Sequence, residues 1–264
     1  MYKTLLTNLD AGIFTITINR PDKLNALNKL VMEELSTAIE EIYEKHDIKS
    51  AVITGAGQKA FVAGADISEF IGLSTGEGMD MAKRGQDIFF MIEDSAKPIV
   101  AAVNGFALGG GCELAMACHF RVAAENAMLG QPEVNLGLIP GYGGTQRLVH
   151  LIGKGRALEL LLSGTMINAQ LALQYGLVNY IVPQAELLNK TRSILEVINT
   201  KAPIAVGKCI HCANVAMQPV AESGGIRNGF VEEINSFGDC FGTHDMKEGT
   251  AAFLEKRKPV FKGK

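Results

Sequence analysis

Two acidic residues around a glycine-rich, apolar segment are the clearest sign of chemistry in this chain. Glu113 follows the triple glycine Gly109–Gly111 and stands inside the apolar stretch Cys112–Cys118, and Glu133 comes later in the string GQPE. Glycines let the backbone turn without side-chain obstruction and leave amide donors open to a ligand. Two carboxyl groups that meet beside open amides suit proton transfer next to a carbonyl group.

The elements between the two acids have lengths that can bring them together. Gly111–Cys118 predicts a helix about 10–12 Å long at roughly 1.5 Å per residue. Phe120–Ala124 predicts a strand about 16 Å long at roughly 3.3 Å per residue. The turn at Glu125–Asn126 then reverses the chain. The sequence therefore permits Glu133 to return to Glu113, and we expect them in one site.

The rest of the first part of the chain alternates between predicted strands and helices. Strands are expected at Thr4–Leu9, Ile13–Ile18, Ala51–Thr54 and Pro98–Val103, and helices at Lys29–His46, capped by Asn28, and at Asp80–Ile92. This order indicates an α/β core with buried strands and helices outside.

From about Pro183 the pattern becomes helical. Four helices are expected, at Glu186–Asn199, Ile204–Met217, Ala221–Phe237 and His244–Lys256. We expect residues 1–195 to form the α/β catalytic core and residues 196–264 a helical C-terminal region. Helices with limited room to cover one another often complete their burial against a partner subunit, so a homo-oligomer is expected.

Composition narrows the class of protein. The chain has 264 residues, 47% apolar and 20% charged, which is typical of soluble globular proteins that need no disulfide or metal staple. A net charge of -3 argues against a nucleic-acid binder, although the tail Glu255–Lys264 is basic. The sequence contains neither a recognisable sorting signal nor a run of about 18 apolar residues, so no membrane partner is expected. The odd number of cysteines, five, favours the cytoplasm.

Three shorter motifs suggest other chemistry and are weaker. Gly55–Ala60 matches GxGxxA, but no helix is predicted after it, and the acid expected about 20 residues on at the end of a second strand is missing, because Thr75–Asp80 is loop-like. Gly109–Gly111 lacks the Gly-Lys-Ser/Thr of a phosphate loop, which leaves a tight packing turn as its alternative. Cys209–Cys212 has CxxC spacing, but no second ligand pair follows, so helix packing is the default.

Each acid also has a structural explanation. Glu113 near a helix start would be favoured by the helix dipole, and Glu133 alone suits a solvated loop. The apolar neighbours of Glu113 leave little room for a polar face, however, and buried acids are uncommon unless paired or functional. Cys112 has no evident partner as a nucleophile, because the nearest histidine, His119, is expected to point away.

The strings AAVNGFALGGGCELAMAC and GQPEVNLGLIPGYGGTQRL resemble the enoyl-CoA hydratase/isomerase (crotonase) family, most of all bacterial-type enoyl-CoA hydratases. Further resemblance lies on both sides, in NRPDKLNAL, FVAGADI, AQLALQYGLVNYIVP and EGTAAFLEKRKPVF. It covers nearly the full chain. It implies a spiral of strand–strand–helix repeats followed by a helical trimerisation region, assembled as a homotrimer or a dimer of trimers. The implied ligand is an acyl-CoA thioester, bound without a metal or redox cofactor.

The resemblance also assigns roles to residues. The backbone amides of Ala65 and Gly110 match an oxyanion hole that holds the thioester oxygen. Glu113 would take a proton from water as it attacks the β-carbon of a trans-2-enoyl-CoA, and Glu133 would give a proton to the α-carbon, forming a 3-hydroxyacyl-CoA. The other substrate-binding positions that it implies are Ala63, Asp66, Ile67, Gln131 and Gly141, with Phe253 and Lys256 near the CoA moiety, where they can serve a neighbouring subunit.

Two features leave details of the substrate open. Ser68 stands where hydratases often carry a lysine that helps to hold CoA, and Phe70–Gly85 lies where the family builds its acyl-pocket wall. Isomerisation and hydration of a branched enoyl-CoA remain alternatives on the same scaffold, although isomerases of the family often lack one of the two acids. An RNA- or acyl-CoA-binding module and a nicotinamide oxidoreductase are more distant alternatives.

Overall fold

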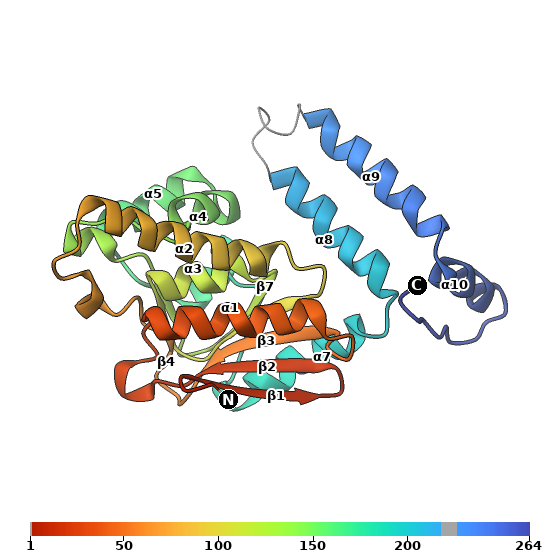
Figure 1. Cartoon of the computed structure of the whole chain (residues 1–264), viewed down its shortest axis with the longest axis horizontal. Helices are drawn as coiled ribbons and strands as arrows, with labels where there is room; N and C mark the ends of the chain where they lie inside the picture. Colours follow the sequence, from red (N-terminus) through yellow and green to blue (C-terminus); the bar gives the residue numbers. More distant parts are fainter. Residues whose placement is uncertain (1, 218–225) are drawn as a thin grey trace.

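Six strands form the larger of two sheets in the computed structural model, which describes residues 2–217 and 226–264 (Figure 1). They are adjacent in the order β1 (Leu5–Asp10), β2 (Ile13–Ile18), β3 (Ser50–Gly55), β5 (Ile99–Val103), β7 (Phe120–Ala124) and β10 (Tyr180–Val182). Only the hairpin β1–β2 is antiparallel among these pairs. Its turn places Ala11 and Gly12 at positive φ (51° and 78°), as a tight hairpin turn requires.

A second sheet is built from very short strands. It runs in the order β4 (Ala60–Val62), β6 (Phe106–Leu108), β8 (Met128–Gly130) and β9 (Ile167–Asn168), and its first three strands are parallel. Sequence reasoning did not identify β4, β6 or β9, because two or three residues show no periodicity. The segment Gly55–Ala60 leads into β4 rather than into a helix, which excludes the dinucleotide motif there.

Three successive strand–strand–helix units generate the spiral that the sequence predicts. The units are β3–β4–α2 (Thr75–Glu93), β5–β6–α3 (Gly110–Ala117) and β7–β8–α4 (Gly144–Ile152). In each unit the first strand joins the six-stranded sheet and the second joins the small sheet. Because the chain advances by one strand in both sheets with every unit, successive units bring the ends of their second strands side by side. The predicted spiral is therefore confirmed.

The N-terminal ends of the two long helices show one prediction confirmed and one corrected. α1 (Lys29–Glu44) begins after Asn28, whose side chain accepts a hydrogen bond from the Val31 N–H at 2.9 Å, as predicted. The stretch Thr75–Asp80, predicted to be a loop, is the first turn of α2. A capping box explains the difference, since the Ser74 hydroxyl and the Glu77 carboxylate each accept the other residue's backbone N–H.

The remaining helices complete the chain. They are α5 (Lys154–Ser163), α6 (Ala169–Tyr175), α7 (Leu187–Ile198), α8 (Pro203–Met217), α9 (Ile226–Phe241) and α10 (His244–Leu254), with short 3-10 turns at Pro21–Lys23, Ile67–Phe70, Glu133–Leu136 and Gln184–Glu186. The predicted helix Ala221–Phe237 begins outside the described residues and continues as α9. No helix within residues 2–217 and 226–264 has both the length and the apolarity to span a membrane.

The buried apolar residues form two clusters, one on each face of the six-stranded sheet. The larger cluster joins both sheets to α1–α6, and the smaller one packs Leu187 and Leu195 of α7 against the opposite face of the six-stranded sheet. The expected boundary between residues 195 and 196 therefore falls within α7. Beyond α7, the paired helices α8 and α9 project from the core, with α10 at their far end (Figure 1).

Candidate active site

Glu113 is a buried acid with fixed hydrogen-bond donors. It lies in α3 with 1% of its surface exposed, and its Oε1 accepts the N–H groups of Tyr142 at 2.8 Å and Gly144 at 2.6 Å. Burial raises the pKa of Glu113 to about 7, and the negative charge of Glu133 acts in the same direction. The two N–H donors and the charge of Arg147 oppose that rise. The carboxyl group can therefore exchange a proton near neutral pH.

The triple glycine allows α3 to sit this deep. A Cβ atom at Gly111 would lie 1.9 Å from the carbonyl oxygen of Val62 in β4, and one at Gly109 would lie 2.5 Å from Oε1 of Glu133. Gly109 also has a positive φ of 49°. Gly111 thus permits the close packing expected of a tight turn, and Gly109 leaves room for the carboxyl group of Glu133.

Glu133 begins the short turn after β8 and lies beside the first acid. The Gln131 amide, in the orientation selected by hydrogen bonding, donates to both carboxylate oxygens of Glu133 at 3.2 Å. Gly144 lies next to both Gln131 and Glu113. A Cβ atom built on Gly144 would lie 2.7 Å from the second terminal atom of the Gln131 amide and 2.9 Å from Oε1 of Glu113. Burial raises the pKa of Glu133, as it does that of Glu113. The structure therefore brings the two predicted acids together around Gln131.

Ala65 and Gly110, whose backbone amides are predicted to bind an oxyanion, both lie next to Leu27. Ala65 forms a β-bridge with Leu27, and the flanking bonds run from the Leu27 N–H to Gly64 and from the Asp66 N–H to Leu27. A Cδ atom of Leu27 lies 3.4 Å from the Cβ position at Gly110, the first residue of α3. Within the described part of the chain, neither the Ala65 nor the Gly110 N–H donates a backbone hydrogen bond.

The residues on both sides of Ala65 include Asp66 and Ser68, which form a polar cluster with Arg20. Asp66 accepts hydrogen bonds from the hydroxyl of Ser68 at 2.7 Å and from the guanidinium of Arg20 at 3.0 Å, which together lower the pKa of its carboxyl group. Ile67 is 53% exposed. Ala63 donates its N–H to Leu24. Ser68, which departs from the family's lysine, is therefore engaged with Asp66.

The other predicted residues divide between the site and the far end of the chain. Gly141 belongs to the loop that supplies the donors of Glu113, and its carbonyl accepts a hydrogen bond from Gln86 of α2 at 2.8 Å. Phe253 lies in α10 and is 82% exposed, and Lys256 follows that helix with a positive φ of 55°. Figure 1 shows α10 well separated from α3, so one chain does not bring these two residues to the acids.

Sequence reasoning missed the residues that hold Glu113. Tyr142 and Gly144 supply the N–H donors, and the signal for them was the glycine-rich string before α4. The Tyr142 ring stands between α2 and α3: a Cβ at Gly85 would lie 2.2 Å from one ring edge, and the Cβ position at Gly110 lies 3.4 Å from the other. Phe89 packs edge-on against the same ring, with centroids 5.6 Å apart.

The histidine and the cysteine nearest to Glu113 in the sequence take no part in the site. Nδ1 of His119 accepts the N–H of Ile99 at 2.8 Å, so this histidine is directed into the strand junction, away from the acids, as expected. Burial raises the pKa of the Cys112 thiol to about 12, which keeps it protonated and unreactive near neutral pH. In residues 2–217 and 226–264, no three His, Cys, Asp or Glu side chains are grouped to hold a metal ion.

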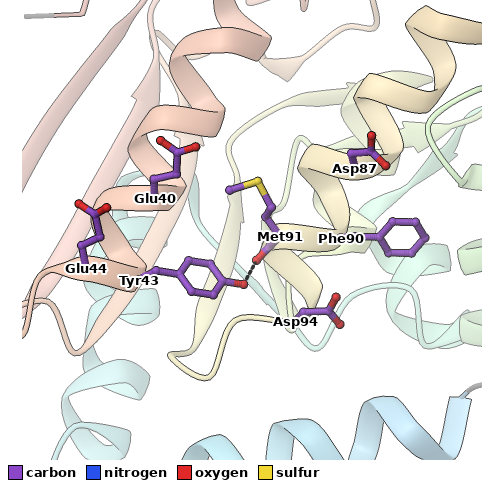
Figure 2. Close-up of a pocket in the computed structure, with 7 residues that line it drawn as sticks. All are labelled: Glu40, Tyr43, Glu44, Asp87, Phe90, Met91 and Asp94. Carbon is purple, nitrogen blue, oxygen red and sulfur yellow. Dashed lines mark hydrogen bonds between the residues drawn. The ribbon is translucent and has the colours of Figure 1, made fainter.

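In the described part of the chain, hollows of two sizes lie along α1 and α2, and the smaller one reaches Tyr142 of the site. A hollow of about 80 Å³ is bounded by Tyr142 and Gly85, with Met32, Met81 and Ile88 among its apolar walls. A larger hollow of about 370 Å³ lies between the far halves of α1 and α2 (Figure 2), and is lined by Glu40, Tyr43, Glu44, Asp87, Phe90, Met91 and Asp94. Neither hollow includes Glu113 or Glu133, and the smaller one adjoins the site through Tyr142.

Known proteins match the whole chain. A crotonyl-CoA hydratase of Syntrophomonas wolfei is 45% identical over 260 residues, which cover 98% of each chain. A short-chain-enoyl-CoA hydratase of Clostridium acetobutylicum is 46% identical over 249 residues, which cover 94% of each. The crystal structure of an enoyl-CoA hydratase from Bacillus anthracis matches with a TM-score of 0.93 at 38% identity, covering 99% of this chain and 100% of that one.

The sequence model of the enoyl-CoA hydratase/isomerase family matches residues 8–264. This match includes both acids, the C-terminal helices α8–α10 and, apart from the first residues of β1, the strands of both sheets. The chain therefore belongs to the enoyl-CoA hydratase/isomerase family.

Proposed function

We propose that this protein adds water reversibly across the 2,3 double bond of a trans-2-enoyl-CoA to give a 3-hydroxyacyl-CoA. The observation that carries the proposal is the pair of acids, the buried Glu113 and the half-buried Glu133, which lie around Gln131 beside the amides of Ala65 and Gly110. The names of the similar proteins, which are hydratases of crotonyl-CoA and of short-chain enoyl-CoA, support it.

The two acids divide the proton transfers between them. Glu113, as the carboxylate, takes a proton from the water whose oxygen bonds to the β-carbon. Its pKa of about 7 makes it a stronger base than an exposed glutamate while leaving a large ionised fraction at neutral pH. Glu133, whose raised pKa favours the protonated form, gives its proton to the α-carbon. One water is thereby added, and dehydration uses the same groups in reverse.

Backbone amides stabilise the charge that builds on the thioester oxygen. The Gly110 N–H lies at the start of α3, where the helix dipole adds positive potential, and the Ala65 N–H completes the pair. Loss of one such donor typically costs about 100- to 1000-fold in rate. Since two acids and two amides serve every bond that changes, the proposed reaction uses no metal or redox cofactor.

The binding part of the proposal concerns the ends of the substrate. Ala63, Asp66, Ile67 and Gly141 would line the thioester, and the small hollow beside Tyr142 suits a short acyl chain. The free cysteines accord with a reducing, cytoplasmic location.

The quaternary part of the proposal concerns the C-terminal helices. α9 exposes an apolar stripe at helical spacing, formed by Phe230, Ile234, Phe237 and Phe241, with 54–69% of each residue exposed. We expect residues 196–264 to bury this stripe in a homotrimer or a dimer of trimers. Such an assembly would also present Phe253 and Lys256 to the CoA moiety bound by a neighbouring subunit.

Hydration of crotonyl-CoA tests the proposal. The variants Glu113→Gln and Glu133→Gln keep the shape of each side chain and should each lose activity by about 100- to 10,000-fold. Glu125→Gln, at an exposed turn, is the matched control and should keep full activity. Undiminished turnover in either site variant would remove that acid from the mechanism, and an inactive wild-type protein would overturn the function.

A further inference from the structure

The loop that holds Glu113 is itself held by charged and polar side chains from two helices. Tyr142 donates its backbone N–H to Glu113, and its backbone carbonyl accepts a hydrogen bond from Nη1 of Arg147 at 2.9 Å. Gln86 bonds the preceding carbonyl, that of Gly141. The backbone of Tyr142, through its N–H on one side and its carbonyl on the other, therefore connects the acid to the guanidinium of Arg147.

Arg147 is fixed on its other sides as well. Its Nε and Nη2 both donate to Oε2 of Glu93 in α2, at 3.1 Å and 2.7 Å, and its guanidinium lies 5.1 Å from the centroid of the Phe90 ring. Only 8% of its side chain is exposed. A Cβ at Gly143 would lie 2.4 Å from Nη1, so the glycine at this positive φ of 102° permits the approach. The guanidinium has little freedom to move.

We infer that Arg147 is a positioning residue for Glu113, with Glu93 setting both the orientation of the guanidinium and the net charge behind the acid. This inference rests on the proposed function, in which Glu113 is the base that activates water. Arg147 acts through the backbone of Tyr142 and touches no reacting atom. Glu93 acts one step further away, through Arg147.

The charges predict opposite effects of the two residues on Glu113. A buried positive charge favours the ionised carboxyl group, and a nearby negative charge disfavours it. The other titratable groups that face Glu113 are Glu133 in the turn after β8, the Tyr142 phenol before α4 and Cys112 on α3 itself. These groups are unchanged in variants of Arg147 or Glu93, so any shift in the titration of Glu113 reports the ion pair.

Infrared difference titration and steady-state kinetics over a pH series test this inference together. The carboxyl band that disappears in Glu113→Gln identifies the group to follow. In Arg147→Met, Glu113 should titrate at higher pH than in the wild type, and in Glu93→Gln at lower pH. The kcat of Arg147→Met should fall by about 100-fold through misplacement of the Tyr142 backbone, with a much smaller change in KM.

Two further variants separate charge from geometry. Arg147→Lys keeps the positive charge but not the fork that bonds Glu93 and Tyr142 at once, so Glu113 should titrate closer to its wild-type pH while kcat still falls. Arg192→Met breaks the ion pair with Asp10 and is the matched control. It should change neither the titration nor kcat.

The sign of the shifts decides the outcome. Shifts of Glu113 in the same direction in Arg147→Met and Glu93→Gln, or no shift in either, would overturn the inference. Should Arg147→Met fail to fold, Glu93→Gln decides alone, and a rise or no change in the titration of Glu113 rejects it. Because the infrared titration needs no substrate, a wild-type protein without hydratase activity would reject the proposed function while leaving this test intact.

Discussion

The site and the C-terminal helices differ in how much of their structure one chain completes. Every residue of α3 is buried, and its single carboxyl group has two backbone donors. α9 exposes Phe230, Ile234, Phe237 and Phe241 on one stripe. A buried charge must be satisfied within the chain that buries it, whereas an apolar stripe can wait for a partner. Substitutions in α3 should therefore act on folding and chemistry, and those in α9 on assembly.

Gly111→Ala should have the largest effect. The added methyl group would lie 1.9 Å from the Val62 carbonyl oxygen, which belongs to strand backbone and cannot move without displacing β4. We expect a loss of more than about 4 kcal/mol in the free energy of unfolding, measured by urea denaturation. Gly155→Ala in α5, where no atom lies within 4 Å, is the control and should be tolerated. Equal stabilities for the two variants would contradict the close packing of α3.

Glu113→Gln should change stability in a pH-dependent way. Burial raises the pKa of Glu113 to about 7, above the value of about 4.5 expected in the unfolded chain, so the folded state holds the proton more tightly. The free energy of unfolding of the wild type therefore falls as pH rises between these two values. The free energy of unfolding of the variant minus that of the wild type should therefore be larger at pH 8 than at pH 4, by up to about 3 kcal/mol.

Denaturation curves of both proteins at each pH measure this difference. Glu125→Gln, at an exposed position, should show no such dependence. A wild-type-to-variant difference that stays constant across the range would show that Glu113 is not buried with a raised pKa. Because Glu113 acts as a base only when it is ionised, the same raised pKa predicts that kcat/KM for hydration rises with pH through about 7.

The two acids could be predicted from sequence because their types and order carry information. Glu113 stands alone in an apolar helix, and the lengths of the following strand and turn allow Glu133 to return to it. The donors of Glu113 could not be assigned from the sequence, since the glycine-rich string before α4 indicates a turn but not which of its backbone N–H groups point at the acid. Tyr142 and Gly144 act through their peptides, and only the fold shows which peptides face the carboxylate.

The same distinction explains the errors in the fold. Periodicity revealed most strands of the large sheet and most helices, but β4, β6 and β10 have three residues each and show no period. The start of α2 was misread because Gly76 and Gly78 favour a loop, while the capping box of Ser74 and Glu77 outweighs them. The ion pair of Glu93 and Arg147 joins residues far apart in the chain, and sequence patterns within one element do not reveal it.

Ile234→Ser should weaken assembly and leave the fold of the subunit unchanged. The side chain is 69% exposed in the single chain, so burying it against a second copy would contribute about 2 kcal/mol to association. Sedimentation equilibrium should show a shift towards smaller species, with each subunit's secondary structure retained. Asn235→Ser, at the next exposed position, is the control. A wild-type monomer would contradict the proposed oligomer.

Gly238→Ala should have the smallest effect and the most informative sign. Gly238 is exposed inside α9, and no atom of the chain lies within 4 Å of its Cβ position. Alanine in a helix interior is favoured over glycine by about 1 kcal/mol, so the free energy of unfolding should rise by that amount. Gly153→Ala has equal space but a φ of 81°, and should be destabilised by backbone strain. A loss of stability and of assembly in Gly238→Ala would instead place this glycine within the contact between subunits, where a second copy approaches the backbone of α9.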